Sequence, residues 1–162
     1  MNWMKKVAVA LVCLLPLGLQ AAKIDTLQVK SPSMNKSIEV VVVSPDVAAT
    51  KACPVIYLLH GYGGNACTWV GIKPDLPKIA DEKGIFFVCP DGKNTWYWDS
   101  PLNADVRYET FISNELVKYV DSHYKTVADR KGRAITGLSM GGHGAMWNGL
   151  RQSDVFSAAG ST

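Results

Sequence analysis

Two continuous apolar runs most constrain what this 162-residue chain can fold into. The first covers residues 54–60 (PVIYLLH) and the second residues 85–89 (IFFVC), and neither alternates apolar with polar residues. A strand with one face in water shows that alternation, so both runs predict strands that are buried on both faces. Such strands pair in parallel beneath helices, which favours an α/β fold with a mostly parallel sheet.

Segments of helical periodicity lie between the expected strands. Helices are predicted at residues 75–83 with Gly84 as the stop, at 105–124, and at 140–151. A short strand is expected at residues 133–136, residues 154–159 are expected to start a further strand, and a hairpin is expected from residues 24–30 and 37–44. After the hairpin, strand and helix alternate, which predicts one domain with helices on both faces of the sheet.

The first 21 residues have the pattern of a secretory signal peptide. Lys5 and Lys6 precede an apolar run, and the small residues Ala21 and Ala22 follow it. The run is too short for a membrane span, which needs about 20 apolar residues, so no stable membrane anchor is expected. Cleavage after Ala21 would leave residues 22–162 as the mature domain, in the periplasm or secreted. The formal net charge would fall from +3 to +1, so charge indicates no nucleic-acid partner.

Three cysteines, Cys53, Cys67 and Cys89, remain once the expected leader is removed. An export compartment permits disulfides, and an odd count allows at most one bridge, whose pairing the sequence leaves open. No CxxC motif or Cys/His cluster occurs, so neither a metal site nor a cofactor is expected.

The sequence GLSMG at residues 137–141 lies between an expected strand and an expected helix. GxSxG is the pattern of a nucleophile elbow, a sharp strand-to-helix turn that exposes the serine hydroxyl. Flanking glycines let strand and helix approach without a Cβ clash, and the helix N-terminus favours negative charge near the serine. The short pattern is weak by itself, but its position between strand and helix makes Ser139 the candidate nucleophile.

A glycine-rich loop, residues 60–64 (HGYGG), follows the first buried strand. Hydrolases with such an elbow stabilise the oxyanion with the amide after the nucleophile and with another from an earlier strand-to-helix loop. The backbone amides of Met140 and Tyr62 are therefore the candidate oxyanion donors. His60 is expected to order this loop rather than to act as a base.

Three consecutive aromatic residues, Trp96, Tyr97 and Trp98, follow the second buried strand. Ligands of such sheets bind beyond the carboxyl ends of the strands, so these residues are candidate substrate-binding residues for an acyl, aryl or sugar group. They are equally suited to packing the loop onto the domain. The sequence leaves both interpretations open.

Four segments together resemble the esterase D family: HGYGG at 60–64, DGKNTWYWDSPLN at 91–103, RYETFISNELVKYVD at 107–121 and GLSMGGHGA at 137–145. This family includes S-formylglutathione hydrolases, tributyrin esterases, feruloyl and acetyl-xylan esterases, and the related mycolyltransferases. The resemblance implies an α/β-hydrolase fold and cofactor-free hydrolysis of carboxylic esters, with Ser139 as nucleophile and Met140 and Tyr62 as oxyanion donors. The expected leader favours a polysaccharide-linked or lipid-like ester over a cytosolic substrate.

The chain departs from this family in the acid and the base of the triad. Chain order in the fold places an acidic residue and then a histidine after the serine. After Ser139 the sequence offers only Asp154, at a helix end, and His143, which is expected to pack on the helix flank; His123 suits the end of the long helix. We therefore expect a C-terminally truncated domain that lacks the acid and base and is inactive alone.

Three other functions remain as alternatives. The first is an acyltransferase on the same scaffold, which would pass the acyl group to a sugar hydroxyl. The second is a non-catalytic glycan-binding module that uses the aromatic loop. The third, a peptidase, is less favoured because no segment indicates a peptide-binding subsite.

Overall fold

The computed structural model describes residues 22–162, so the expected signal peptide, residues 1–21, lies outside the described residues. Within that range one sheet has the strand order β1-β2-β4-β3-β5-β6. The strands are β1 Lys23–Ser31, β2 Lys36–Ser44, β3 Val55–Leu59, β4 Phe86–Pro90, β5 Arg133–Gly137 and β6 Ala158–Ser161.

The pairing of the strands confirms the predicted hairpin and the mostly parallel sheet. β1 and β2 are antiparallel, with Lys23 opposite Ser44, and β2 is also antiparallel to β4. The remaining pairs, β4 with β3, β3 with β5 and β5 with β6, are parallel. The two runs without alternation, β3 and β4, lie at the centre of the sheet, as their burial requires.

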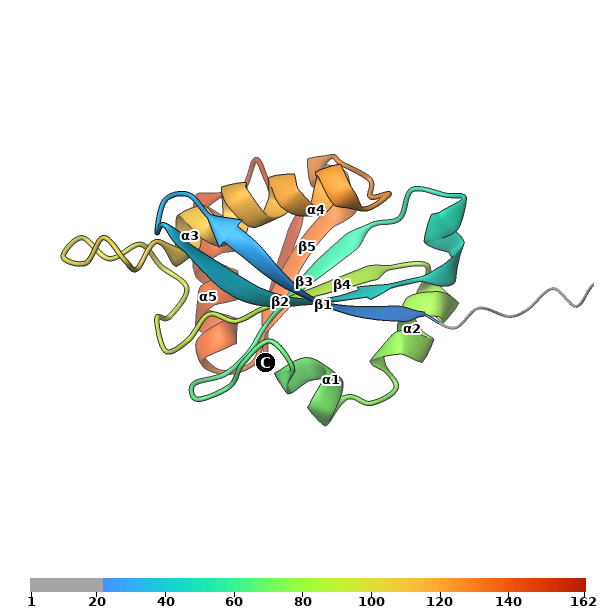
Figure 1. Ribbon diagram of the computed structural model, residues 1–162, viewed down its shortest axis with the longest axis horizontal. Helices are drawn as coiled ribbons and strands as arrows, with labels where there is room; N and C mark the ends of the chain where they lie inside the picture. Colours follow the sequence, from blue (N-terminus) through green and yellow to red (C-terminus); the bar gives the residue numbers. More distant parts are fainter. Residues whose placement is uncertain (1–21) are drawn as a thin grey trace, which may run out of the picture.

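Helices cover both faces of the sheet, as predicted (Figure 1). One face carries α3 to α5 and the other carries α1 and α2. The helical segments are η1 Asp46–Ala49, α1 Thr68–Ile72, α2 Leu76–Lys83, α3 Tyr108–Thr110, the π-helical η2 Phe111–Leu116, α4 Val117–His123, η3 Arg130–Gly132 and α5 Met140–Arg151. α2 stops at Gly84 in the left-handed conformation (φ 63°), as expected. Across residues 22–162 no helix has the length and apolarity that a membrane crossing needs.

Alternate residues of each strand enter two separate apolar cores, because successive side chains point to opposite faces. In β2, Val40 and Val42 join the core beneath α4 and α5, whereas Val41 and Val43 join the core beneath α2. The second core includes Leu58 and Phe87 from the central strands. The sheet is therefore fixed from both sides, and the loops at its carboxyl edge extend from a rigid base.

Two predicted boundaries were wrong. The long helix begins at Tyr108 rather than at residue 105, because the Ser100 amide bonds the carbonyl of Val106 at 2.8 Å and holds the preceding residues in a loop. β6 begins only at Ala158, because residues 152–155 form a turn in which the Val155 amide bonds the carbonyl of Gln152.

Candidate active site

Ser139 lies on a sharp turn between β5 and α5. Its backbone has φ 53° and ψ −112°, a conformation that non-glycine residues rarely adopt. Such strain costs about 1–3 kcal/mol and persists only where the surroundings impose it. Ser139 is exposed, so the turn presents its hydroxyl to solvent, as the GxSxG pattern predicted.

Two glycines make this turn sterically possible. A Cβ on Gly137 would overlap the backbone of Gly141, and a Cβ on Gly141 would overlap the carbonyl of Leu59 at the end of β3. Any side chain at either position would therefore push α5 away from the sheet. The close approach brings the N-terminus of α5 directly against the carboxyl ends of β3 and β5.

The glycine-rich loop after β3 lies against the elbow. A Cβ built on Gly61 would be 3.7 Å from the Cβ of Ser139 and 3.4 Å from the carbonyl oxygen of Leu138. Neither the Tyr62 amide nor the Met140 amide has a hydrogen-bond partner within residues 22–162. The structure thus brings both candidate donor segments beside Ser139, with their amides available.

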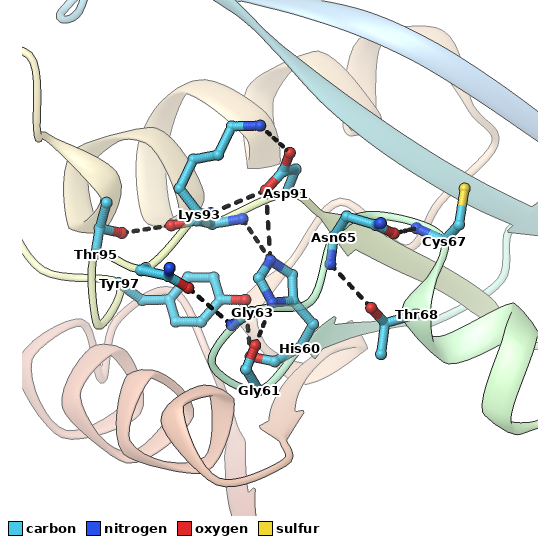
Figure 2. A network of polar contacts seen from close by, with 12 residues as sticks. His60, Gly61, Gly63, Asn65, Cys67, Thr68, Asp91, Lys93, Thr95 and Tyr97 are labelled. Carbon is cyan, nitrogen blue, oxygen red and sulfur yellow. Dashed lines mark hydrogen bonds and ion pairs between the residues drawn. The ribbon is translucent and has the colours of Figure 1, made fainter.

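His60 is buried between this loop and the loop after β4 (Figure 2). Its Nδ1 lies 2.7 Å from the carbonyl oxygen of Gly61, and its Nε2 lies 2.9 Å from the amide nitrogen of Gly92. An amide N–H can only donate, so Nε2 accepts and Nδ1 carries the proton that is donated to Gly61. His60 is neutral in this arrangement, and the 3.5 Å contact of Nε2 with Asp91 is therefore not an ion pair. The expectation that His60 orders the glycine-rich loop is confirmed.

Further hydrogen bonds join the same two loops (Figure 2). The Gly63 amide donates to Oδ1 of Asn94 at 2.8 Å, and the Tyr97 hydroxyl donates to the carbonyl of His60 at 3.1 Å. Asp91 in turn accepts from the Lys93 amide and side chain. Burial opposes the charge on Asp91, but these bonds prevail and hold the pKa of its carboxyl below the usual value.

The prediction that Tyr97 binds substrate was wrong, because the residue is buried. Its side chain is 0% exposed, packs edge-to-face on His60 and fills the space beside Gly144 on α5. Its carbonyl also accepts from Nδ2 of Asn148 at 3.0 Å, and burial raises the pKa of its hydroxyl. Tyr97 therefore packs the aromatic loop onto the domain and has no surface from which to touch a ligand.

Trp96 and Trp98 do face solvent, with 46% and 41% of their surfaces exposed. Together with His143 they line a cleft of about 340 Å³. His143 lies edge-to-face on Trp96 and stacks on Trp147, so it packs on the helix flank as expected. Trp147 also lies edge-to-face against Trp98 and so joins the same aromatic group. The sequence did not predict that Trp147 belongs to it.

A buried carboxylate near the far end of α5 was also missed. Glu109 accepts from Nε1 of Trp147 at 2.7 Å, from Nε of Arg151 at 2.9 Å and from Nε2 of Gln152 at 2.8 Å. Burial opposes its charge, but these bonds hold the pKa of Glu109 below its usual value. Glu109 thus fixes α5 against α3.

Each of the three histidines among residues 22–162 bonds a backbone carbonyl rather than the hydroxyl of Ser139. His60 bonds the glycine-rich loop, His123 bonds the carbonyl of Tyr119 in α4, and His143 bonds the carbonyl of Trp96. Asp154 is exposed in the turn after α5. In the same range no group of acidic, histidine or cysteine side chains is arranged to hold a metal ion.

The cysteines are unpaired in the described chain. Cys53 and Cys89 are buried and Cys67 is exposed. Burial raises the pKa of both buried thiols, which keeps them protonated and unreactive at neutral pH.

Comparisons with known proteins agree with this geometry. A family model described as "Putative esterase" matches residues 31–162. An acetyl esterase from Caldicellulosiruptor saccharolyticus is 32% identical over 102 residues, which are 62% of this chain and 37% of that protein. Among solved structures, a ferulic acid esterase has a TM-score of 0.73 at 31% identity, covering 86% of this chain and 61% of its own. An S-formylglutathione hydrolase from Agrobacterium tumefaciens has a TM-score of 0.75 at 25% identity. That match covers 85% of this chain and 57% of the hydrolase.

The chain therefore spans little more than a third of the acetyl esterase and about three fifths of the two solved structures. The match nevertheless includes the glycine-rich loop, the aromatic loop and the elbow.

Proposed function

Because this chain belongs to the esterase family of α/β-hydrolases, we propose that it supplies the nucleophile and oxyanion hole of a secreted serine carboxylesterase. The observation that carries the proposal is the strained, solvent-exposed Ser139 at the N-terminus of α5. Strain of this kind is maintained at functional sites, and an ordinary turn would avoid it.

In the proposed reaction, Oγ of Ser139 attacks the carbonyl carbon of an ester and loses its proton to a base. The tetrahedral oxyanion then expels the alcohol, which takes up a proton, and an acyl-enzyme remains. Water hydrolyses this ester, releases the carboxylic acid and restores the serine. The amides of Met140 and Tyr62 would donate to the oxyanion, and the N-terminus of α5 would add favourable electrostatics.

The chain by itself is proposed to be a poor catalyst. Its histidines are all bound elsewhere, so none takes the proton of Ser139. Triad members act as a unit, and loss of one costs several orders of magnitude in rate. We expect little turnover of p-nitrophenyl acetate, and turnover that Ser139→Ala abolishes would contradict this part of the proposal.

The substrate is proposed to be a small or polysaccharide-linked ester with a ring that stacks in the cleft between Trp96 and Trp98. The apolar faces of exposed indole rings suit aryl groups and sugar rings alike. The similarity to a ferulic acid esterase and an acetyl esterase supports a feruloyl or acetyl ester. A sugar acceptor that became acylated would instead favour the acyltransferase alternative.

Stoichiometric acylation tests the nucleophile without requiring a base. Enzymes without their triad retain about 10³–10⁴-fold catalysis from the oxyanion hole and binding. We therefore expect prolonged incubation with p-nitrophenyl acetate to acetylate Ser139 faster than the exposed Ser153, as read by peptide mass spectrometry. This preference should vanish in urea. Equal acetylation of both serines in the folded chain would refute the proposal.

A further inference from the structure

The backbone amide of Ala22 donates a hydrogen bond to a carboxylate that has no cationic partner within residues 22–162. Its nitrogen donates to Oδ2 of Asp81 in α2 at 2.8 Å, across 59 residues of sequence. The other oxygen, Oδ1, accepts from the Asp46 amide at 2.8 Å. Within residues 22–162, no lysine, arginine or histidine forms an ion pair with Asp81. The carboxylate is therefore bonded by two neutral amides and its charge is uncompensated.

Ala22 is the first residue that the structure describes. β1 starts at the next residue, Lys23, which pairs with Ser44 in the last rung of the hairpin. The side chain of Ala22 is partly buried against the apolar core beneath α2. Figure 1 shows the start of β1 beside α2, so the residue is held both by packing and by its amide.

The position of this contact coincides with the cleavage site that the sequence predicts, after Ala21. Hydrolysis of that peptide bond consumes one water, leaves a carboxylate on Ala21 and leaves an ammonium group on Ala22. The nitrogen that now donates as a neutral amide would then carry a full positive charge at 2.8 Å from Asp81. Charge-assisted hydrogen bonds are about twice as strong as neutral ones.

We propose that Asp81 is a docking site for the amino terminus created by signal-peptide cleavage. Removal of the leader turns a neutral hydrogen bond into an ion pair that fastens β1 to α2. This inference rests on the export step proposed above, and it gives Asp81 a role that the ester chemistry does not require. It also predicts Ala22, and not Lys23, as the first residue of the exported protein.

The test is N-terminal sequencing of the exported chain, followed by labelling of its α-amino group with an amine-selective acylating reagent at neutral pH. An amino group in an ion pair reacts slowly, because acylation requires the free amine. We expect Asp81→Asn to speed labelling of Ala22 about fivefold, the factor that corresponds to an ion pair of about 1 kcal/mol. Glu82→Gln is the matched control, because this neighbouring carboxylate pairs with Lys78 and should leave the rate unchanged.

Three results would overturn the inference: a different first residue, equal labelling rates in the native protein and Asp81→Asn, or the same rate in native and urea-unfolded protein. The last comparison needs no variant, so it decides the matter even if Asp81→Asn does not fold. If the chain is not exported, the export proposal fails separately. A chain with an initiator methionine before Ala22, which cells remove ahead of alanine, then still tests the ion pair by the same labelling.

Discussion

Replacing Tyr97 with phenylalanine removes one buried hydroxyl and leaves the packing of the ring in place. That hydroxyl donates to the carbonyl oxygen of His60 at 3.1 Å, and within residues 22–162 this oxygen accepts no other hydrogen bond. A typical hydrogen bond contributes about 0.5–1.5 kcal/mol, and a buried acceptor without a partner costs about 1–3 kcal/mol. Because the two ranges overlap between about 1 and 1.5 kcal/mol, we expect Tyr97→Phe to lower the free energy of unfolding by about that amount.

Urea unfolding followed by circular dichroism measures this change. Tyr62→Phe is the control, because Tyr62 is 67% exposed and should change stability by less than about 0.5 kcal/mol. The loss should also be local: hydrogen exchange at the Gly63 amide should accelerate about tenfold, since 1.4 kcal/mol corresponds to a factor of ten. Equal effects of the two substitutions, or unchanged exchange at Gly63, would refute the view that Tyr97 holds the glycine-rich loop.

Three further outcomes are expected. Ser139→Gly should raise the free energy of unfolding by about 1 kcal/mol in the same urea assay, because glycine adopts the positive φ without strain, while acetylation at this position is lost. The pKa of Glu109 lies below its ordinary 4.5 in the folded state, so the stability it adds is present above that value and disappears as pH falls through the folded pKa. Glu109→Gln should therefore flatten the decline of the melting temperature in acid. Iodoacetamide at mildly alkaline pH should modify Cys67 and spare Cys53 and Cys89 until the protein unfolds, as read by mass spectrometry.

The central strands and the elbow were predictable because their causes are local. Burial on both faces leaves an unbroken apolar run, as in residues 54–60, and a tight strand-to-helix turn demands glycine at 137 and 141. The start of the long helix was not predictable in this way. It depends on an antiparallel backbone bridge between Asp99 and Arg107 across a loop, and helical periodicity gives no sign of such a bridge.

The aromatic loop shows a second limit of sequence reasoning. Trp96 and Tyr97 both have φ 59°, in the left-handed region that large side chains rarely occupy. This backbone directs Tyr97 inward between His60 and Asn148, while Trp96 and Trp98 remain outside. Three adjacent aromatic residues look alike in sequence, so their opposite burial becomes visible only when the loop is folded.

Glu109 was missed for a related reason. A single acidic residue in a helix ordinarily indicates a solvated face, because an unpaired carboxylate is rarely buried. Its partners Trp147, Arg151 and Gln152 lie 38 to 43 residues later in the chain, and only the packing of α3 against α5 brings them together. A site assembled from such distant residues leaves no spacing pattern that could have predicted it.

Two backbone hydrogen bonds balance the strain at the elbow. The positive φ of Ser139 costs about 1–3 kcal/mol. Against it, the Leu138 amide bonds the carbonyl of Leu59 at 3.1 Å and the Ser139 amide bonds the carbonyl of Thr162 at 2.9 Å. At about 0.5–1.5 kcal/mol each, these two bonds offset the strain. Both partners belong to the sheet or lie directly after β6, so the parallel strands help to impose the geometry of Ser139. The backbone conformation of Ser139 is therefore held by backbone hydrogen bonds and does not depend on a side chain that bonds its hydroxyl.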